Sequence, residues 1–279
     1  AYSCVSRIKL KSLFSGGNKL AGKVLLLAEK KYDKLISTIL IGNNIVNLSA
    51  SSVAGILFAK LLVNSDLNPS VVSTVFITIV VLIFGEITPK LIAKSCAASD
   101  ARMDGATLAV YSNSGSGNQG LTCTLPVYEY GRLTNKTKEE IIRALTLSHL
   151  MSIYIKNKIG RLSALCGIVN ASMGAAAGIT LLKGGGIYQM CYAIRNMINT
   201  ITGMACDGAK PSCALKVSAG LNSAFDSVLL AMNDKVVDST DGIAEGCIDR
   251  SIENLGKIGR YAMDEVDNMI LDIMIHKEK

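Results

Sequence analysis

The chain has 279 residues, a formal net charge of +7 and 49% hydrophobic residues, with a mean hydropathy of +0.37. Its eight cysteines are spread without a compact spacing, which argues against a disulfide framework and leaves cytosolic thiols or metal ligands. The basic excess flanks apolar sequence rather than lining a polar, aromatic-bearing face, so no nucleic-acid partner is predicted.

The charge is unevenly distributed along the chain. Residues 1–100 carry 11 Lys and Arg against 5 Asp and Glu, a net of +6, whereas the remaining 179 residues carry 18 against 17. The first third also holds two long apolar stretches, while the rest alternates apolar and charged residues as a soluble helical domain does. We therefore predict a membrane domain over residues 1–94 and a soluble domain over residues 95–279.

Two apolar runs in the first third predict transmembrane helices. Residues 35–59 form 25 residues without a charge, long enough to span a bilayer, whereas residues 71–84 could be a short span or a buried helix. Residues 1–34 carry eight Lys and Arg, and Lys90 and Lys94 follow the second run, so both flanks are expected on the cytoplasmic side. The chain is thus expected to be membrane-associated through residues 35–88, with its C-terminal domain cytoplasmic.

Polar residues recur on one face of the first predicted span. Ser37, Asn44, Asn47 and Ser51 follow a helical period, and such groups are costly in hydrocarbon without partners. One interpretation is hydrogen bonding between helices with small-residue faces. The other is oxygen ligation of a hard cation such as Mg²⁺, with Glu86 supplying a carboxylate.

The motifs GNKLAGKVLLLAEKKYDKLISTILIGNNIVN and IFGEITPK lie within residues 1–94. This segment resembles the transmembrane domain of the CorC/cyclin-M (CNNM) magnesium transporters. It lacks the first and last helices of that family, and no regulatory CBS domain follows, so transport by the segment is not expected. The resemblance implies Mg²⁺ binding by polar residues of the helices, namely Ser37, Asn43, Asn44, Asn47 and Glu86.

A loop rich in Gly and small hydroxyl residues follows, with the sequence SNSGSGNQG over residues 112–120. Such a loop lets backbone N–H groups approach a carboxylate or phosphate closely, although an ordinary flexible turn has the same composition. It is not a P-loop, because no Gly-Lys-Ser/Thr follows.

The rest of the chain predicts helices and no strands, so the fold class is all-α: N-terminal transmembrane helices followed by a soluble helical domain. A helix over residues 137–157 is expected to begin with capping by Thr137 and acidic residues in its first turn. The other expected helices cover residues 161–182, 187–204, 214–233 and 247–275.

Three cysteines carry the chemical signal. Cys206 and Cys213 flank a turn with Gly and Pro, and Cys166 lies 40 residues before Cys206 in a Gly/Ala-rich stretch. This is not the CxxC spacing of a zinc site. Three thiolates on separate elements could hold an iron–sulfur cluster with one open iron, while buried unreacted thiols are the alternative.

The motifs SDARMDG, NSGSGNQG, GMACDGAKPSCALKVS, DGIAEG and LGKIGR lie within residues 95–279. This part resembles the alpha-chain domain of iron–sulfur L-serine dehydratases, in the branch that includes L-cysteine desulfidases. The resemblance implies a [4Fe–4S] cluster on Cys166, Cys206 and Cys213. It also implies that Ser114, Ser116 and Asn118 hold the carboxylate and ammonium of a small amino acid.

The implied reaction is α,β-elimination, in which a base removes the α-proton and the open iron acts as Lewis acid on the β-hydroxyl or β-thiol. The products are pyruvate and ammonia, plus H₂S from cysteine. The base is not assigned, since His149 and His276 could both be exposed. Lys216 could neutralise the cluster or be solvated. Cys123 and Cys191 are interpreted as core residues.

Three functions stay open at this point: the lyase, a membrane Mg²⁺ transporter or sensor fragment, and a chimera of two fragments with neither activity. We favour the lyase because all its expected ligands are present. A homo-oligomer is compatible with either activity.

Overall fold

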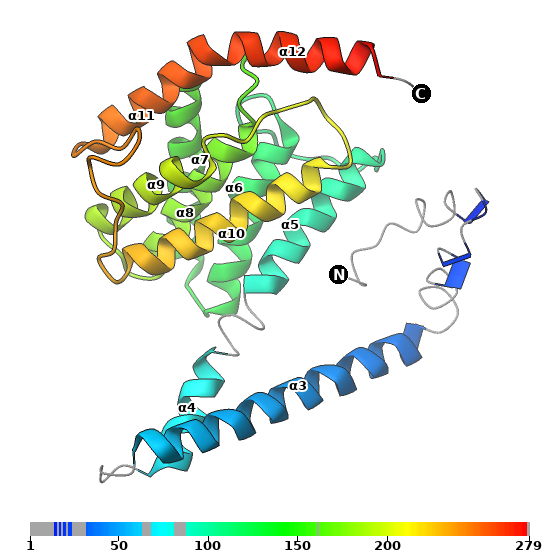
Figure 1. The fold of residues 1–279 in the computed structure, drawn as a ribbon, viewed down its shortest axis with the longest axis vertical. Helices are drawn as coiled ribbons and strands as arrows, with labels where there is room; N and C mark the ends of the chain where they lie inside the picture. The colour runs from blue at the N-terminus through cyan, green and yellow to red at the C-terminus, as the bar shows by residue number, and fades with distance from the viewer. Residues whose placement is uncertain are drawn as a thin grey trace. The chain divides into compact units, whose positions relative to one another are not determined.

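The computed structural model describes residues 14–15, 17, 19–20, 22–23, 32–62, 68–80, 88–160 and 162–277. Regular structure in these residues is helical, and their β contacts are two isolated bridges, Asn113 with Ser116 and Leu165 with Ala205 (Figure 1). The all-α prediction is therefore confirmed. The chain divides into two compact units, residues 1–90 and residues 91–279, which are described in turn.

The first unit contains α3 (Tyr32–Leu61) and α4 (Pro69–Val80), which pack against each other. The rings of Phe58 and Phe76 lie 5.3 Å apart between their centroids and join the two helices. Within α3, the hydroxyls of Ser49 and Ser52 donate to carbonyls one turn earlier, at 2.8 and 2.9 Å, so these groups are satisfied inside their own helix.

Within the described residues, none of the helices combines the length and the apolar character that a membrane span requires. Helix α4 has 12 residues against the roughly 20 that a span needs, and α3, although 30 residues long, does not meet both conditions over its described residues. The predicted transmembrane helices and membrane association through residues 35–88 therefore have no support, and the predicted membrane localisation with a cytoplasmic C-terminal domain is contradicted.

The second unit is a helical bundle. Its first helix, α5, begins shortly before residue 91, where the second unit begins. The helices of this unit are α5 (Thr88–Met103), α6 (Gly117–Leu133), α7 (Lys138–Ile159), α8 (Gly167–Leu182), α9 (Ile187–Ile201), α10 (Cys213–Ala231), α11 (Ile248–Lys257), the π-helix η3 (Ile258–Ala262) and α12 (Met263–Ile275).

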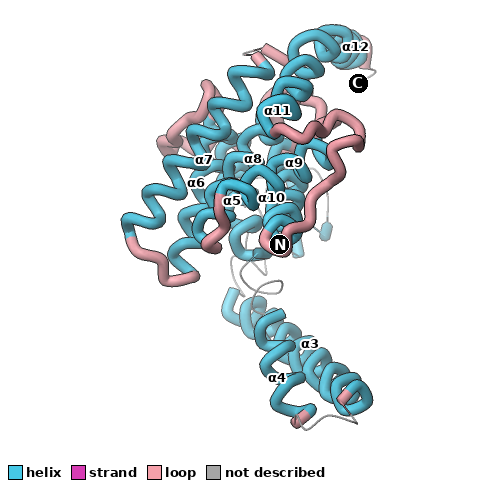
Figure 2. Tube along the Cα trace, turned by 90° about the vertical axis from the view of Figure 1, so that its left-hand side faces the viewer, coloured by secondary structure: helices cyan, strands magenta, loops and turns pink. Residues whose placement is uncertain are grey.

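Helix α8 forms the centre of the bundle, and α6, α7, α9 and α10 pack around it (Figures 1 and 2). Every residue from Ile168 to Thr180 is buried. The Ala, Gly and Ser residues of this helix permit close approach: a Cβ on Gly174 would lie 2.3 Å from the Ser148 carbonyl oxygen of α7. Small side chains in α8 therefore determine how near its neighbours lie.

The start of α7 is confirmed as predicted. Thr137 is its N-cap, its hydroxyl accepts from the backbone N–H of Glu140, and the Glu140 carboxylate accepts from the N–H of Thr137 at 2.8 Å. This capping box satisfies two N–H groups that the helix cannot pair itself.

Two predicted helix boundaries differ from the structure. Helix α8 begins at Gly167 rather than residue 161, because the residues before it pair in extended form with the segment before Cys206; the Cys166 N–H donates to Met204 O at 2.9 Å. The predicted helix 247–275 is three elements, because η3 interrupts the α-helical period between α11 and α12.

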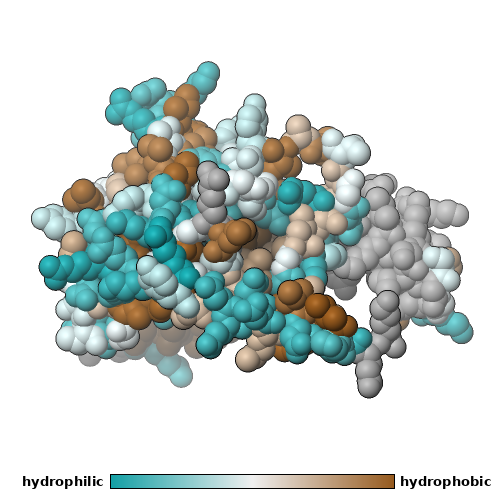
Figure 3. Space-filling model, turned by 90° about the horizontal axis from the view of Figure 1, so that it is seen from above, coloured by the Kyte–Doolittle hydropathy of each residue, from teal (hydrophilic) through white to brown (hydrophobic). Residues whose placement is uncertain are grey.

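On the face that carries α12, apolar side chains interrupt the polar surface (Figure 3).

Candidate functional site

The Gly/Ser loop forms an ordered tight turn. Asn113 and Ser116 exchange two backbone hydrogen bonds of 3.1 and 3.0 Å, with Ser114 and Gly115 between them at φ +51° and +85°. Two consecutive positive φ values are typical of the I′ turn of a two-residue hairpin. Ser116 then caps α6, accepting from the N–H of Gln119 at 3.4 Å. The predicted loop is thus a fixed hairpin in front of a helix N-terminus.

Asn113 anchors this turn in the bundle. Its side chain is buried, and its Nδ2 lies 3.0 Å from His149 Nδ1 and donates to the His149 carbonyl at 3.2 Å. The other ring nitrogen of His149 lies 3.0 Å from Thr124 Oγ1. Burial lowers the pKa of His149, which favours the neutral ring. With both nitrogens engaged, His149 supports the turn and is not placed as a base.

The first turn of α6 presents two buried amides, Asn118 and Gln119. Asn118 Oδ1 accepts from Arg102 Nη1 of α5 at 3.1 Å, and Gln119 Oε1 accepts from Asn170 Nδ2 of α8 at 2.9 Å. Gly167 leaves room for Gln119, whose Nε2 would lie 2.3 Å from a Cβ at that position. Because Arg102 donates to Oδ1 of Asn118, the NH₂ group of this amide is left to donate to another group.

The three predicted cluster ligands come from separate elements. Cys166 is the N-cap of α8, Cys206 lies in the segment that bridges to Leu165, and Cys213 begins α10. All three line one cavity of about 330 Å³, together with Ser116 and Asn118. The fold thus brings together residues that are up to 97 positions apart in the sequence.

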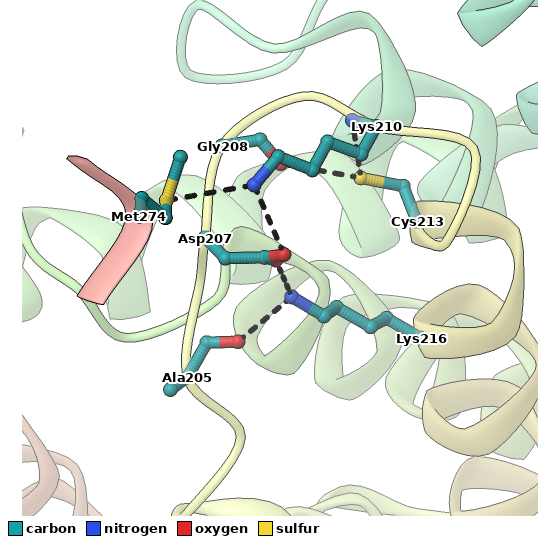
Figure 4. Close-up of polar contacts among 7 residues, drawn as sticks. All are labelled: Ala205, Asp207, Gly208, Lys210, Cys213, Lys216 and Met274. Carbon is teal, nitrogen blue, oxygen red and sulfur yellow. Dashed lines mark hydrogen bonds and ion pairs between the residues drawn. The ribbon is translucent and has the colours of Figure 1, made fainter. Parts of the chain in front are cut away.

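The thiols of Cys166 and Cys206 lie close enough to shift each other's pKa. The Cys166 thiol, the backbone N–H of Gly208 and the charge of Lys216 lower the pKa of Cys206. The same thiol pair and burial raise the pKa of Cys166. Cys213 accepts from the backbone N–H of Lys210 at 3.5 Å (Figure 4). Cys206 is therefore the thiol best prepared to exist as thiolate, the form that binds metals.

Asp207 joins two lysines beside these thiols. It forms ion pairs with Lys216 and with Lys210, the latter at 3.4 Å, and Lys216 also donates to the Ala205 carbonyl at 2.9 Å (Figure 4). The Lys216 ammonium holds the pKa of Asp207 below its usual range. Lys216 is thus not a solvated helix lysine, and its charge is shared between Asp207 and the cysteine pair.

Ser114 does not line the cysteine cavity. It lines a neighbouring cavity of about 640 Å³, and Gly115 and Lys156 line both cavities. His276 lies on the exposed end of α12, where its Nδ1 is 3.1 Å from Asp272. Cys123 is fully buried, which raises its pKa to about 12, and Cys191 is half-buried. His276 therefore lines neither cavity, and Cys123 is a core residue.

Several site residues were not predicted, among them Lys156, Arg102 and Asn170. Lys156 occupies an ordinary position in an amphipathic helix, so no local signal distinguishes it. Arg102 belongs to the motif SDARMDG, which could have indicated it.

The predicted Mg²⁺ ligands are not placed. The side chains of Ser37, Asn43, Asn44 and Asn47, and the whole of Glu86, lie outside the described residues. In the part of the chain that is described, no three His, Cys, Asp or Glu side chains are grouped as ligands of one metal ion. Mg²⁺ binding has no support.

The cysteine cavity fits a cluster better than a single ion. In a four-iron cluster each cysteine binds a different iron, so the ligands surround a volume rather than a point. Cys166, Cys206 and Cys213 line one cavity, and the Lys216 charge lies close enough to lower the pKa of Cys206. Three thiols at one cavity are the type of donor that such a cluster uses.

Comparison with known proteins identifies relatives of the chain. The family described as Serine dehydratase alpha chain matches residues 19–272. The UPF0597 protein of Phocaeicola vulgatus is 56% identical over 188 residues, which are 67% of this chain and 44% of that protein. That of Oleidesulfovibrio alaskensis is 46% identical over 197 residues, 71% of this chain and 46% of that protein. No solved structure matches the chain.

The chain spans less than half the length of these curated relatives. The family match begins at residue 19 and runs through the charge division near residue 95, and no comparison supports a CorC/CNNM segment or a chimera. The division into domains of residues 1–94 and 95–279 stays a prediction. The match over most of the sequence shows that the chain belongs to the serine dehydratase alpha chain family.

Proposed function

We propose that the chain carries the cluster-binding cavity of an iron–sulfur-dependent amino-acid lyase acting on L-serine or L-cysteine. The observation that supports this most directly is that Cys166, Cys206 and Cys213 line one cavity with Ser116 and Asn118. Elimination of water from serine, or of H₂S from cysteine, gives an enamine that hydrolyses to pyruvate and ammonia.

A cluster bound by three thiolates would supply a Lewis acid at the iron without a protein ligand. The residues of the chain hold the substrate. Asn118 is fixed by Arg102 through its Oδ1, which leaves Nδ2 as a donor at the cavity. Ser116 lies at the end of the rigid hairpin, beside the helix N-terminus of α6, where N–H groups favour an anion such as the substrate carboxylate.

Anaerobic reconstitution with iron and sulfide tests the cluster apart from turnover. The wild-type chain is expected to show the charge-transfer absorption of a [4Fe–4S] cluster. Replacement of Cys166, Cys206 or Cys213 by Ser should each remove most of the bound iron. Cys247→Ser is the matched control, because this exposed thiol lies outside the cavity lining.

Pyruvate formation from L-serine and L-cysteine then tests the reaction itself. We expect pyruvate from the reconstituted chain and none from the Cys213→Ser variant. A colourless reconstituted protein would contradict the cluster, and a coloured protein without pyruvate would contradict the elimination by this chain.

A further inference from the structure

Lys156 presents a positive charge to the cavities without forming an ion pair. The residue lies in the last turn of α7 and is 9% exposed, and its ammonium, which is not among the buried polar atoms, makes no hydrogen bond or ion pair with any described residue. The other cations around the cysteines are engaged: Arg102 with Asn118, and Lys210 and Lys216 with Asp207. An unpaired ammonium that lines a cavity attracts negative charge, so such a group points to an anionic ligand.

The position of Lys156 connects two cavities. It lines both the cysteine cavity and the neighbouring cavity of about 640 Å³, in which Ser114 lies. The charged residues that line this second cavity, among those described, are Lys156 and Arg260, both cations. An anion entering from that side therefore meets positive charge before it reaches the thiols.

Arg260 is placed there by an unusual piece of backbone. It lies in η3, and its Nη2 donates to the Asn157 carbonyl at 2.6 Å. Its side chain lies against Gly160, which has φ +97° and ends α7. π-helical turns interrupt a regular helix at a cost and are frequent at functional sites. The backbone irregularities at Gly160 and η3 thus both face the second cavity.

We propose that Lys156 binds the α-carboxylate of the substrate amino acid at the junction of the two cavities, with Arg260 guiding the anion inward. This inference rests on the proposed function and adds to it the residue that recognises the carboxylate. A carboxylate at Lys156 would bring the amino acid to the cavity that Asn118, Cys166 and Cys206 also line. Molecules without a free carboxylate are then poor ligands.

The competing role for Lys156 is compensation of the thiolates, because the charges of Cys206 and Cys166 favour its protonated form against the effect of burial, which lowers its pKa. The two roles predict different effects when Lys156 is replaced. Thiolate compensation affects cluster loading alone, whereas carboxylate binding affects the preference between ligands that carry or lack a carboxylate.

The test uses L-alanine and L-alaninamide, which differ at the carboxylate and have no β-leaving group, so neither is turned over. Calorimetry on the reconstituted chain is expected to show L-alanine bound at least about tenfold more tightly than L-alaninamide, as a site built for a polar group rejects an analogue without it. Lys156→Met should lower that ratio severalfold at unchanged iron content, because Ser116 and the N-terminus of α6 would then hold the carboxylate without the ammonium. Lys158→Met is the matched control, since this partly exposed lysine on the same helix pairs with Glu253 at 3.1 Å and lines neither cavity.

Lys156→Gln provides a second variant if the Met variant does not fold. A Lys156 variant that keeps the preference for L-alanine unchanged overturns the inference, as does one whose sole change is loss of iron, or a wild-type chain without the preference. If carboxylate binding depends on Lys156 but no pyruvate forms, the lyase activity is contradicted and the carboxylate site is retained. Pyruvate formation by Lys156→Met with unchanged KM would retain the lyase and overturn the carboxylate site.

Discussion

Asn170 links the first turn of α6 to α7 inside the bundle. Its Nδ2 donates to Gln119 Oε1 and Ser152 Oγ, both at 2.9 Å, and the side chain is fully buried. Asn170→Ala leaves both acceptors without this donor, so we expect the free energy of unfolding to fall by about 1–3 kcal/mol in urea titrations. Asn222→Ala is the control: Asn222 is exposed and bonds to its own preceding turn, so its change should stay within about 0.5 kcal/mol. Equal losses would contradict the role of Asn170.

His149 gives the stability of the bundle a pH dependence. Burial lowers its pKa in the folded state below 6.5, the value expected after unfolding. Between the two values the unfolded chain binds more protons, so this stabilisation is complete above pH 6.5 and is lost as pH falls through the folded pKa. Urea titrations from pH 5 to 8 should show the decline in wild type and a weaker one in His149→Gln. Asn222→Ala, which changes no titratable group, should show the same decline as wild type; an identical decline in the His149 variant would refute the prediction.

At the scale of elements, the α7–α8 contact depends on Gly174. An alanine Cβ there would lie 2.3 Å from a backbone oxygen of Ser148, which cannot rotate away as a side chain can. Although alanine favours helices over glycine by about 1 kcal/mol, overpacking of this kind typically costs about 1–3 kcal/mol or more. Gly174→Ala should therefore lower the melting temperature. Gly203→Ala, where nothing lies within 4 Å, should not; a raised melting temperature for Gly174→Ala would show that the helices can separate freely.

Features encoded by neighbouring residues could be predicted from the sequence. Thr137 and Glu140 form a capping box within one turn, so the start of α7 was predictable to the residue. The end of α11 was not, because the apolar period of residues 248–275 continues through η3 and hides the irregular turn at Arg260. Residues 35–59 carry no charge over 25 residues, which predicts a span that the described helices do not support.

In the candidate site too, residues that belong to sequence motifs could be predicted, whereas a residue defined by long-range contacts could not. The resemblance in motifs predicted the three cysteines and Ser116 and Asn118, and all of them line one cavity. The placement of Cys166, Cys206 and Cys213 singled out the same three thiols, but it left buried unreacted cysteines as the alternative. Lys156 could not be predicted, since its isolation depends on which partners the other cations find: Lys216 with Asp207, and Arg102 with Asn118. A residue defined by the absence of a partner is visible only in three dimensions.

For the second unit as a whole, the packing around α8 implies a gradient of stability from its centre to α12. Helix α8 is buried along nearly its full length, whereas α12 packs chiefly against η3 and exposes apolar side chains at Met269, Leu271, Ile273 and Ile275. Elements with few buried contacts open without global unfolding. Hydrogen exchange read by mass spectrometry should therefore show α12 amides exchanging at least about tenfold faster than those of α8, which need global opening. Helix α7, packed directly on α8, is the internal control and should exchange slowly. Protection of α12 equal to that of α8 would mean that this helix belongs to the cooperative core, and that its exposed apolar face is covered in solution.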